Sequence, residues 1–126
     1  MKNFVYDAAV LIAADRNERR VWDEHKARLE FGAIPLVPAP VVAQVSRSTR
    51  QALLRRFLAG CKIVALGESE AHEAGRLMGI AETSDVVDAV VVIVAARHKA
   101  VVLTGDRADI ERLASVAHGA VAVAEA

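Results

Sequence analysis

Five short aliphatic runs, separated by segments with helical signals, constrain the fold of this chain most strongly. Apolar residues make up 54% of the chain but aromatic residues only 4%, so the core must be built from Val, Ala, Leu and Ile. Strands covered on both faces read as continuous aliphatic runs, and their alternation with helices is typical of a parallel sheet. The sequence therefore predicts one α/β domain over residues 1–126. The strands are expected at residues 3–6, 34–37, 62–66, 101–104 and 120–123.

Capping residues indicate where several helices begin. Residues 15–18 and 48–51 both have capping-box spacing, in which Asp or Ser is followed three residues later by Glu or Gln. Ser69 is expected to cap the helix over "EAHEAGRLMGI", and a last helix is expected over about residues 107–117.

The segment "TSDVVDAVVVIVAARHK" is ambiguous, because its β-branched residues favour a strand. Thr83 or Ser84 would nevertheless cap a helix, Asp85 suits the positive end of its dipole, and "ARHK" places cations at its other end. We predict a helix here.

Aspartates stand where several of these elements begin or end. Asp7 ends the first strand and Asp106 follows the fourth, so both are expected at the carboxyl edge of the sheet, where open α/β folds bind ligands. Asp85 and Asp88 share the first turn of one helix, and Asp109 lies three residues beyond Asp106. Five carboxylates on one rim repel one another unless a cation neutralises them, and such oxygen ligands suit Mg²⁺ or Mn²⁺. A metal held there can activate water and stabilise charge that develops on a phosphodiester.

Each aspartate also has a purely structural explanation. Asp106 and Asp109 have the spacing of an N-cap and an N3 residue, Asp7 can cap the helix that follows it, and Asp85 can serve a helix dipole. Asp88 fits such an explanation least well, because "DAVVVIVAA" is apolar nearly all round and its helix should be buried. The sequence alone leaves both explanations open.

Charge is segregated along a chain whose formal net charge is zero. Neutrality argues against nucleic-acid binding by bulk electrostatics alone. Residues 31–67 contain no acid, whereas residues 68–96 contain six acids and the single cation Arg76. This division suggests a polyanionic ligand held beside an acidic, metal-charged cleft. The cations of the first segment, which form either a solvated face or a binding surface, are Arg47, Arg50, Arg55, Arg56 and Lys62.

The other residues of interest form no recognisable site. Cys61 is the one cysteine, which excludes an intramolecular disulfide and favours a reducing compartment, and it is expected to be a buried small hydrophobe. Trp22 and Phe31 are expected in the core or an interface. The N-terminus does not read as a signal peptide and no apolar run is long enough to span a membrane, so we expect a cytoplasmic protein. Four histidines without ligand spacing are expected at the surface: His25, His72, His98 and His118.

Three stretches resemble the PIN-domain proteins, and more narrowly the VapC toxins of bacterial toxin–antitoxin pairs. They are "VYDAAVLIA", "PAPVVAQVSR" and "TSDVVDAVVVIVAARHKAVVLTGDRADI", and the resemblance covers essentially the whole chain. It implies a three-layer α/β/α sandwich with a five-stranded parallel sheet, and an Mg²⁺- or Mn²⁺-dependent endoribonuclease. It also implies a homodimer and a cognate antitoxin whose C-terminal segment lies across the active-site groove.

The resemblance assigns roles to individual residues. Thr104 matches the hydroxyl residue of the "TxD" motif, and Asp85 is an extra neighbour of the cluster. The family's usual glutamate after strand two is replaced by Gln44, which keeps an acceptor oxygen but has no charge. Arg47 and Arg50 are expected to face RNA phosphates or acidic groups of the antitoxin. The acids of the family motifs, expected to hold the metal, fall on Asp7, Asp88, Asp106 and Asp109.

Two other functions are compatible with parts of the pattern. A PIN-like domain that has lost catalysis at Gln44 would only bind RNA or protein. A receiver-like signalling domain also gathers aspartates at strand ends, but it expects an acidic pair after the first strand and a phosphoacceptor ending the third. The first strand here carries only Asp7 and the third ends "IVALGES", which argues against that function.

Overall fold

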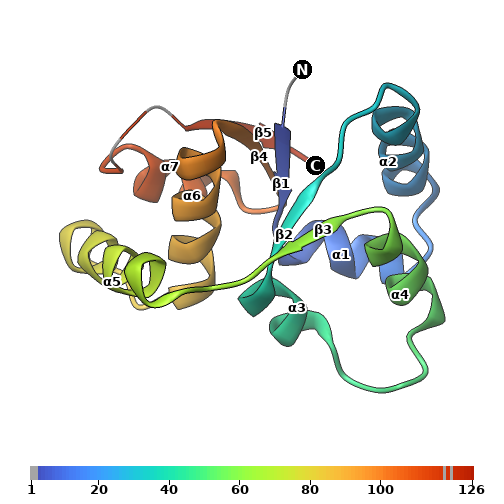
Figure 1. Ribbon diagram of the computed structural model, residues 1–126, viewed down its shortest axis with the longest axis horizontal. Helices are drawn as coiled ribbons and strands as arrows, with labels where there is room; N and C mark the ends of the chain where they lie inside the picture. Colours follow the sequence, from blue (N-terminus) through green and yellow to red (C-terminus); the bar gives the residue numbers. More distant parts are fainter. Residues whose placement is uncertain (1–2, 118, 120) are drawn as a thin grey trace.

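The sheet of this protein is parallel throughout, and its strand order reverses next to β1. The computed structural model describes residues 3–117, 119 and 121–126, and its strands lie in the order β3-β2-β1-β4-β5 (Figure 1). From β1 the chain moves outward to β2 and β3, then crosses back to β4 on the other side of β1. Ligands of open parallel sheets bind at such a reversal. The strands are β1 (Asn3–Tyr6), β2 (Leu36–Pro38), β3 (Lys62–Val64), β4 (Ala100–Thr104) and β5 (Ala122–Glu125).

Helices cover both faces of this sheet, as the sequence predicts. Figure 1 shows α1 (Ala8–Asp15), α2 (Arg19–Glu30) and α4 (Ala52–Ala59) on one side. On the other side lie α5 (Glu68–Ala81), α6 (Val86–His98) and α7 (Arg107–Ala114). The short helix α3 (Ala39–Val45) follows β2 directly and contacts both α1 and α6. The three-layer α/β/α sandwich is therefore confirmed.

The ambiguous apolar segment forms α6, the most deeply buried helix. Every residue from Ala89 to Ala95 is buried, and the helix contacts α5, α7 and three strands. Contacts on all sides stabilise a helix that β-branched residues alone would disfavour. Asp85 is its N-cap, in place of Thr83 or Ser84, and accepts a hydrogen bond from the backbone N–H of Asp88 at 3.0 Å.

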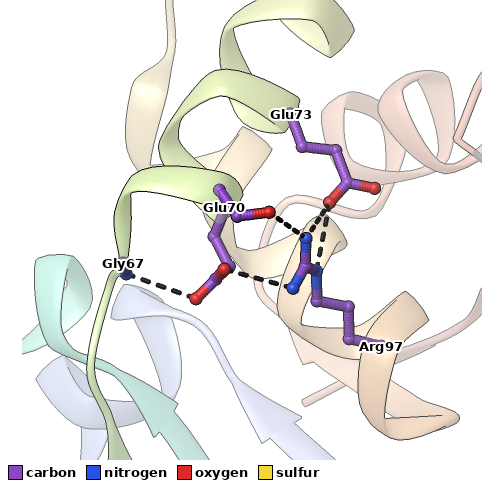
Figure 2. A network of polar contacts seen from close by, with 5 residues as sticks. Gly67, Glu70, Glu73 and Arg97 are labelled. Carbon is purple, nitrogen blue, oxygen red and sulfur yellow. Dashed lines mark hydrogen bonds and ion pairs between the residues drawn. The ribbon is translucent and has the colours of Figure 1, made fainter.

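Arg97, near the end of α6, forms ion pairs with two glutamates near the start of α5. Its guanidinium donates hydrogen bonds to Glu73 at 2.7 Å and to Glu70 at 3.1 Å, and Figure 2 shows it between the two carboxylates. Glu70 also accepts from the backbone N–H of Gly67 at 3.3 Å. Two of the six acids in residues 68–96 are thus paired with a cation within the helical layer.

Several predicted boundaries shift by a few residues. Strand two begins at Leu36 and strand three ends at Val64. The last strand covers Ala122–Glu125, and the part of its predicted range at residue 120 lies outside the described residues. The last helix ends at Ala114, short of the predicted residue 117.

Three further predicted helix caps, Ser69, Asp15 and Ser48, are also wrong. Gly67, not Ser69, precedes α5, and Ser69 lies inside the helix. Asp15 ends α1 and accepts a hydrogen bond from the Gln51 side chain at 3.0 Å, instead of capping α2. Gln51 itself stands at the N-cap of α4, and its side chain accepts from the backbone N–H of Ser48 at 3.1 Å. Ser69 and Asp15 instead accept hydrogen bonds from Arg97 and Gln51 of other segments, which their spacing along the chain does not reveal.

His25 is buried, so the prediction that it lies at the surface is wrong. Only 3% of the residue is exposed; its ring stacks on Phe57 with centroids 4.0 Å apart. Its Nδ1 lies 2.8 Å from the hydroxyl of Tyr6, and that hydroxyl accepts a hydrogen bond from Arg28 at 3.1 Å. The Tyr6 hydroxyl and His25 Nδ1 thus share a hydrogen bond next to the Arg28 charge, and the tautomer of His25 decides which of the two donates. Burial and the Arg28 charge accordingly lower the pKa of His25 to about 4.

The other expectations outside the aspartate cluster have mixed outcomes. Trp22 packs edge-on against Phe57 with centroids 5.0 Å apart, whereas Phe31 is 86% exposed. Cys61 is partly buried, and burial raises its pKa to about 12. His72 is exposed and His98 is partly buried. His118 lies outside the described residues. Among the described helices, none is long and apolar enough to cross a bilayer.

Candidate metal centre

Asp7 lies at the point where the strand order reverses, directly after β1. It is the N-cap of α1, and its Oδ1 accepts a hydrogen bond from the backbone N–H of Val10 at 3.2 Å. The residue is only 5% exposed. Burial raises the pKa of its carboxyl, although the hydrogen bonds it accepts oppose that rise. Burying a charged carboxylate costs free energy. Asp7 also lies at the carboxyl edge of the sheet, where open α/β folds bind their ligands.

The end of β4 supplies the remaining partners of Asp7. Thr104, which is fully buried, donates its hydroxyl to Oδ2 of Asp7, and the backbone N–H of Gly105 donates to the same oxygen at 3.2 Å. The Thr104 hydroxyl in turn accepts from the backbone N–H of Asp106 at 2.8 Å. Thr104, the hydroxyl residue of the "TxD" motif, thus bonds to the carboxylate of Asp7 and to the backbone of Asp106. One chain of hydrogen bonds thus links Asp7 to Asp106.

The N-terminus of α6 brings a second pair of acids to the same region. The side chains of Asp85 and Asp88 are hydrogen-bonded, and the negative charges of Asp7 and Asp106 also act on Asp88. Partial burial and these neighbouring carboxylates raise the pKa of Asp88 to about 7. Asp88 therefore lies close enough to three other acids for their charges to raise its pKa.

Asp106 and Asp109 form a third group at the start of α7. Asp106 is the N-cap and accepts from the backbone N–H of Asp109 at 3.5 Å, so the capping explanation is correct for this pair. Both residues are exposed. The hydrogen bond with Asp106 and its charge raise the pKa of Asp109. Capping uses one oxygen of Asp106 and leaves the carboxylate accessible to solvent.

The carboxylates lie near one another, but their side chains do not converge on one point as the ligands of a bound cation do. Within residues 3–117, 119 and 121–126, no three side chains of Asp, Glu, His or Cys are close enough to hold a metal ion. The donor chemistry still suits a hard divalent cation, since every donor is a carboxylate oxygen. The raised pKa values of Asp7 and Asp88 mean that the charged form of each carboxyl is disfavoured, and a bound cation would stabilise that form.

Gln44 and the two candidate arginines lie on the surface. Gln44 is exposed near the end of α3. Arg47 and Arg50 are exposed in the segment that follows, and Arg47 donates to the carbonyl of Ser46 at 3.0 Å. They remain candidates for contact with phosphates or acidic side chains.

Gly105 is a member of the site that sequence reasoning missed. Its N–H bonds to Asp7, and its lack of a side chain brings the β4–α7 turn close to Ala9. The sequence signal was the glycine at the middle position of the "TxD" motif. The motif specifies no residue type at that position, so it assigns Gly105 no role.

Comparison with known proteins places this geometry in context. The PIN domain family matches residues 4–116. VapBC2 from Rickettsia felis, solved bound to a DNA fragment from the promoter, contains a chain of similar fold, with a TM-score of 0.78 and 14% identity over 98% of both chains. FitAcB from Neisseria gonorrhoeae gives a TM-score of 0.66 with 16% identity, over 94% of this chain and 96% of that one.

A third similar structure is PAE2754 from Pyrobaculum aerophilum. Its TM-score is 0.63 with 18% identity, over 96% of this chain and 89% of that one. At these identities the likeness shows the fold alone. No curated protein sequence gives a significant match.

Proposed function

Because this chain belongs to the PIN domain family, we propose that it is an Mg²⁺- or Mn²⁺-dependent endoribonuclease and the toxin of a toxin–antitoxin pair. One observation carries the proposal. Asp88, at the start of α6, feels the charges of the acids that follow β1 and β4, at the sheet edge where the strand order reverses. Such a concentration of carboxylates is costly to maintain unless it binds a cation.

The residues proposed to hold the cation are Asp7, Asp88 and Asp106, with Asp109 beside them. When bound, the cation supplies the positive charge that activates water and stabilises a phosphodiester under attack. Asp7 depends on Thr104 and the Gly105 N–H for its orientation. Asp85 contacts Asp88 and adds negative charge next to it.

The exposed arginines are proposed to bind the polyanionic substrate. Arg47 and Arg50 lie in a segment without acids, and a guanidinium pairs with two oxygens of a phosphate at once. The same cations would suit acidic groups of an antitoxin. We propose further that the protein acts in the cytoplasm as a homodimer.

Gln44 supports a second candidate, a PIN domain that binds RNA or protein without cutting it. The residue is exposed and uncharged where the family's usual residue is a glutamate. A missing carboxylate lowers cation affinity, so catalysis would be weak or absent.

Cleavage of a panel of structured RNAs with and without Mn²⁺ tests the proposal. We expect wild-type protein to cut in Mn²⁺ and not in EDTA. Asp7→Asn should abolish cutting, whereas Asp23→Asn, a matched change at an exposed position on α2, should cut like wild type. Equal cleavage by Asp7→Asn would rule out the assignment of Asp7. RNA retention without products would favour the binding module.

A further inference from the structure

The close approach of the β4–α7 turn to the start of α1 depends on the absence of a side chain at residue 105. A Cβ added to Gly105 would lie 2.5 Å from the Cβ of Ala9, well inside the distance that real Cβ atoms tolerate. Ala9 has no rotamer that could move its Cβ away, so the backbone of one segment would have to shift. Gly105 does not have a positive φ. Space, and not backbone conformation, therefore requires glycine here.

The two segments in contact are the ones that carry the first and third acids. Ala9 lies in the first turn of α1, two residues after its N-cap Asp7, and Gly105 directly precedes Asp106. The same approach lets the Gly105 N–H reach Oδ2 of Asp7 at 3.2 Å. A shift of either segment would separate Asp7 from the turn that orients it.

We propose that Gly105 is a positioning residue of the acidic cluster, which acts through its contact with Ala9 to hold the Asp7 carboxylate at the end of β4. This inference rests on the proposed function, because Asp7 matters there as a cation ligand. Gly105 itself contacts neither substrate nor cation. The two segments approach closely because both Ala9 and Gly105 are small. A larger residue at one of these positions should therefore be compensated by a smaller residue at the other.

A mutant cycle in EDTA tests the contact without any metal. Gly105→Ala should lower the thermal midpoint of unfolding. Ala9→Gly in the wild-type background should also lower it, because glycine disfavours a helix. In the Gly105→Ala background the same Ala9→Gly change should raise the midpoint, since it removes the clash. The effect of Ala9→Gly thus reverses its sign.

Calorimetric titration with Mn²⁺ tests the consequence for the cluster. Gly105→Ala should weaken binding about 10- to 100-fold, as losses of residues that orient metal ligands do. The double variant Ala9→Gly, Gly105→Ala should recover most of that loss. Gly75→Ala is the matched control, because a Cβ at Gly75 on α5 meets nothing within 4 Å. It should leave Mn²⁺ affinity unchanged.

The outcomes separate this inference from the proposed function. Unchanged Mn²⁺ affinity in Gly105→Ala, or a loss that Ala9→Gly fails to restore, would overturn the positioning role. Wild-type protein that binds no Mn²⁺ would overturn the proposed function instead. In that case the cycle in EDTA still tests the contact on which the positioning role depends: additive effects of the two changes would refute the contact, and the positioning role with it.

Discussion

The hydroxyl of Thr104 donates a hydrogen bond to the carboxylate of Asp7, although 97 positions separate the two residues in the chain. Both are buried; Thr104 is the last residue of β4, and Asp7 directly follows the neighbouring strand β1. The orientation of the first acid of the cluster is therefore determined by the adjacent strand. Changes at the end of β4 should consequently alter the environment of Asp7.

Thr104→Val should destabilise the protein by about 1–3 kcal/mol, because it leaves a buried carboxylate and a backbone N–H each short of one partner. The change keeps the shape of the side chain, so loss of packing contributes little. Urea unfolding measures the effect. Thr49→Val, at an exposed position, should change stability by no more than about 0.5 kcal/mol. Similar results for the two variants would mean that the hydroxyl bond contributes nothing.

Asp88→Asn should stabilise the protein in EDTA at pH 8. Folding raises the pKa of Asp88 to about 7, so its contribution to stability is present at low pH and is lost as the pH rises toward 7. Removing the charge should recover about 1 kcal/mol, a figure reduced for solvent screening of a partly exposed group. With saturating Mn²⁺ the order should reverse, because only the wild type gains from binding.

Denaturant unfolding in EDTA and in saturating Mn²⁺ measures whether wild type or Asp88→Asn is the more stable under each condition. Asp23→Asn, on α2, is the control. A loss of stability for Asp88→Asn in EDTA would contradict the view that charge repulsion strains the metal-free cluster.

The sheet and its edge could be predicted from the sequence, because both depend on local patterns. Aliphatic runs identify strands, and an aspartate at the end of β1 or β4 must lie at the carboxyl edge once the sheet is parallel. Even the ambiguous segment is correctly predicted to be a helix from the acid at its start and the cations at its end, although its N-cap is Asp85 and not Thr83 or Ser84. Such patterns repeat every few residues and need no knowledge of distant contacts.

Three features that the sequence does not predict depend on contacts between distant segments. His25 is buried because Tyr6 and Phe57 pack against it from other elements, although its helical spacing from Trp22 was a signal. Arg97 neutralises acids that lie 24 and 27 positions before it, on another helix. The contact of Gly105 with Ala9 is of the same kind.

The neutral state of His25 should make the protein less stable in acid. Its folded pKa of about 4 lies below the ordinary value of 6.5, so the unfolded chain takes up the proton first as the pH falls. The free energy of unfolding should decrease between about pH 6.5 and pH 4, by up to about 3 kcal/mol from this group. His25→Phe should remove that part of the pH profile, while His72→Gln, at an exposed position, should retain it. Parallel profiles for wild type and His25→Phe would contradict the buried neutral ring.

Replacing both Arg47 and Arg50 with Gln should weaken RNA binding and reduce its salt dependence. For each phosphate that is no longer neutralised, the slope of log K against log salt should become shallower by about 0.7 for a single strand. Fluorescence anisotropy in the Asp7→Asn background, which should prevent cleavage, measures this slope. The control replaces the exposed Arg19 and Arg20 on α2, and its slope should equal that of the parent. Equal slopes for both double variants would remove Arg47 and Arg50 from the proposed RNA surface.

A crystal grown with Mn²⁺ and measured at an energy where manganese scatters anomalously tests the central claim most directly. The account predicts one or more anomalous peaks at the carboxyl edge of the sheet, each ion in contact with carboxylate oxygens, among them those of Asp7, Asp88 and Asp106. An empty edge at saturating Mn²⁺, with these three side chains directed away from one another, would contradict it.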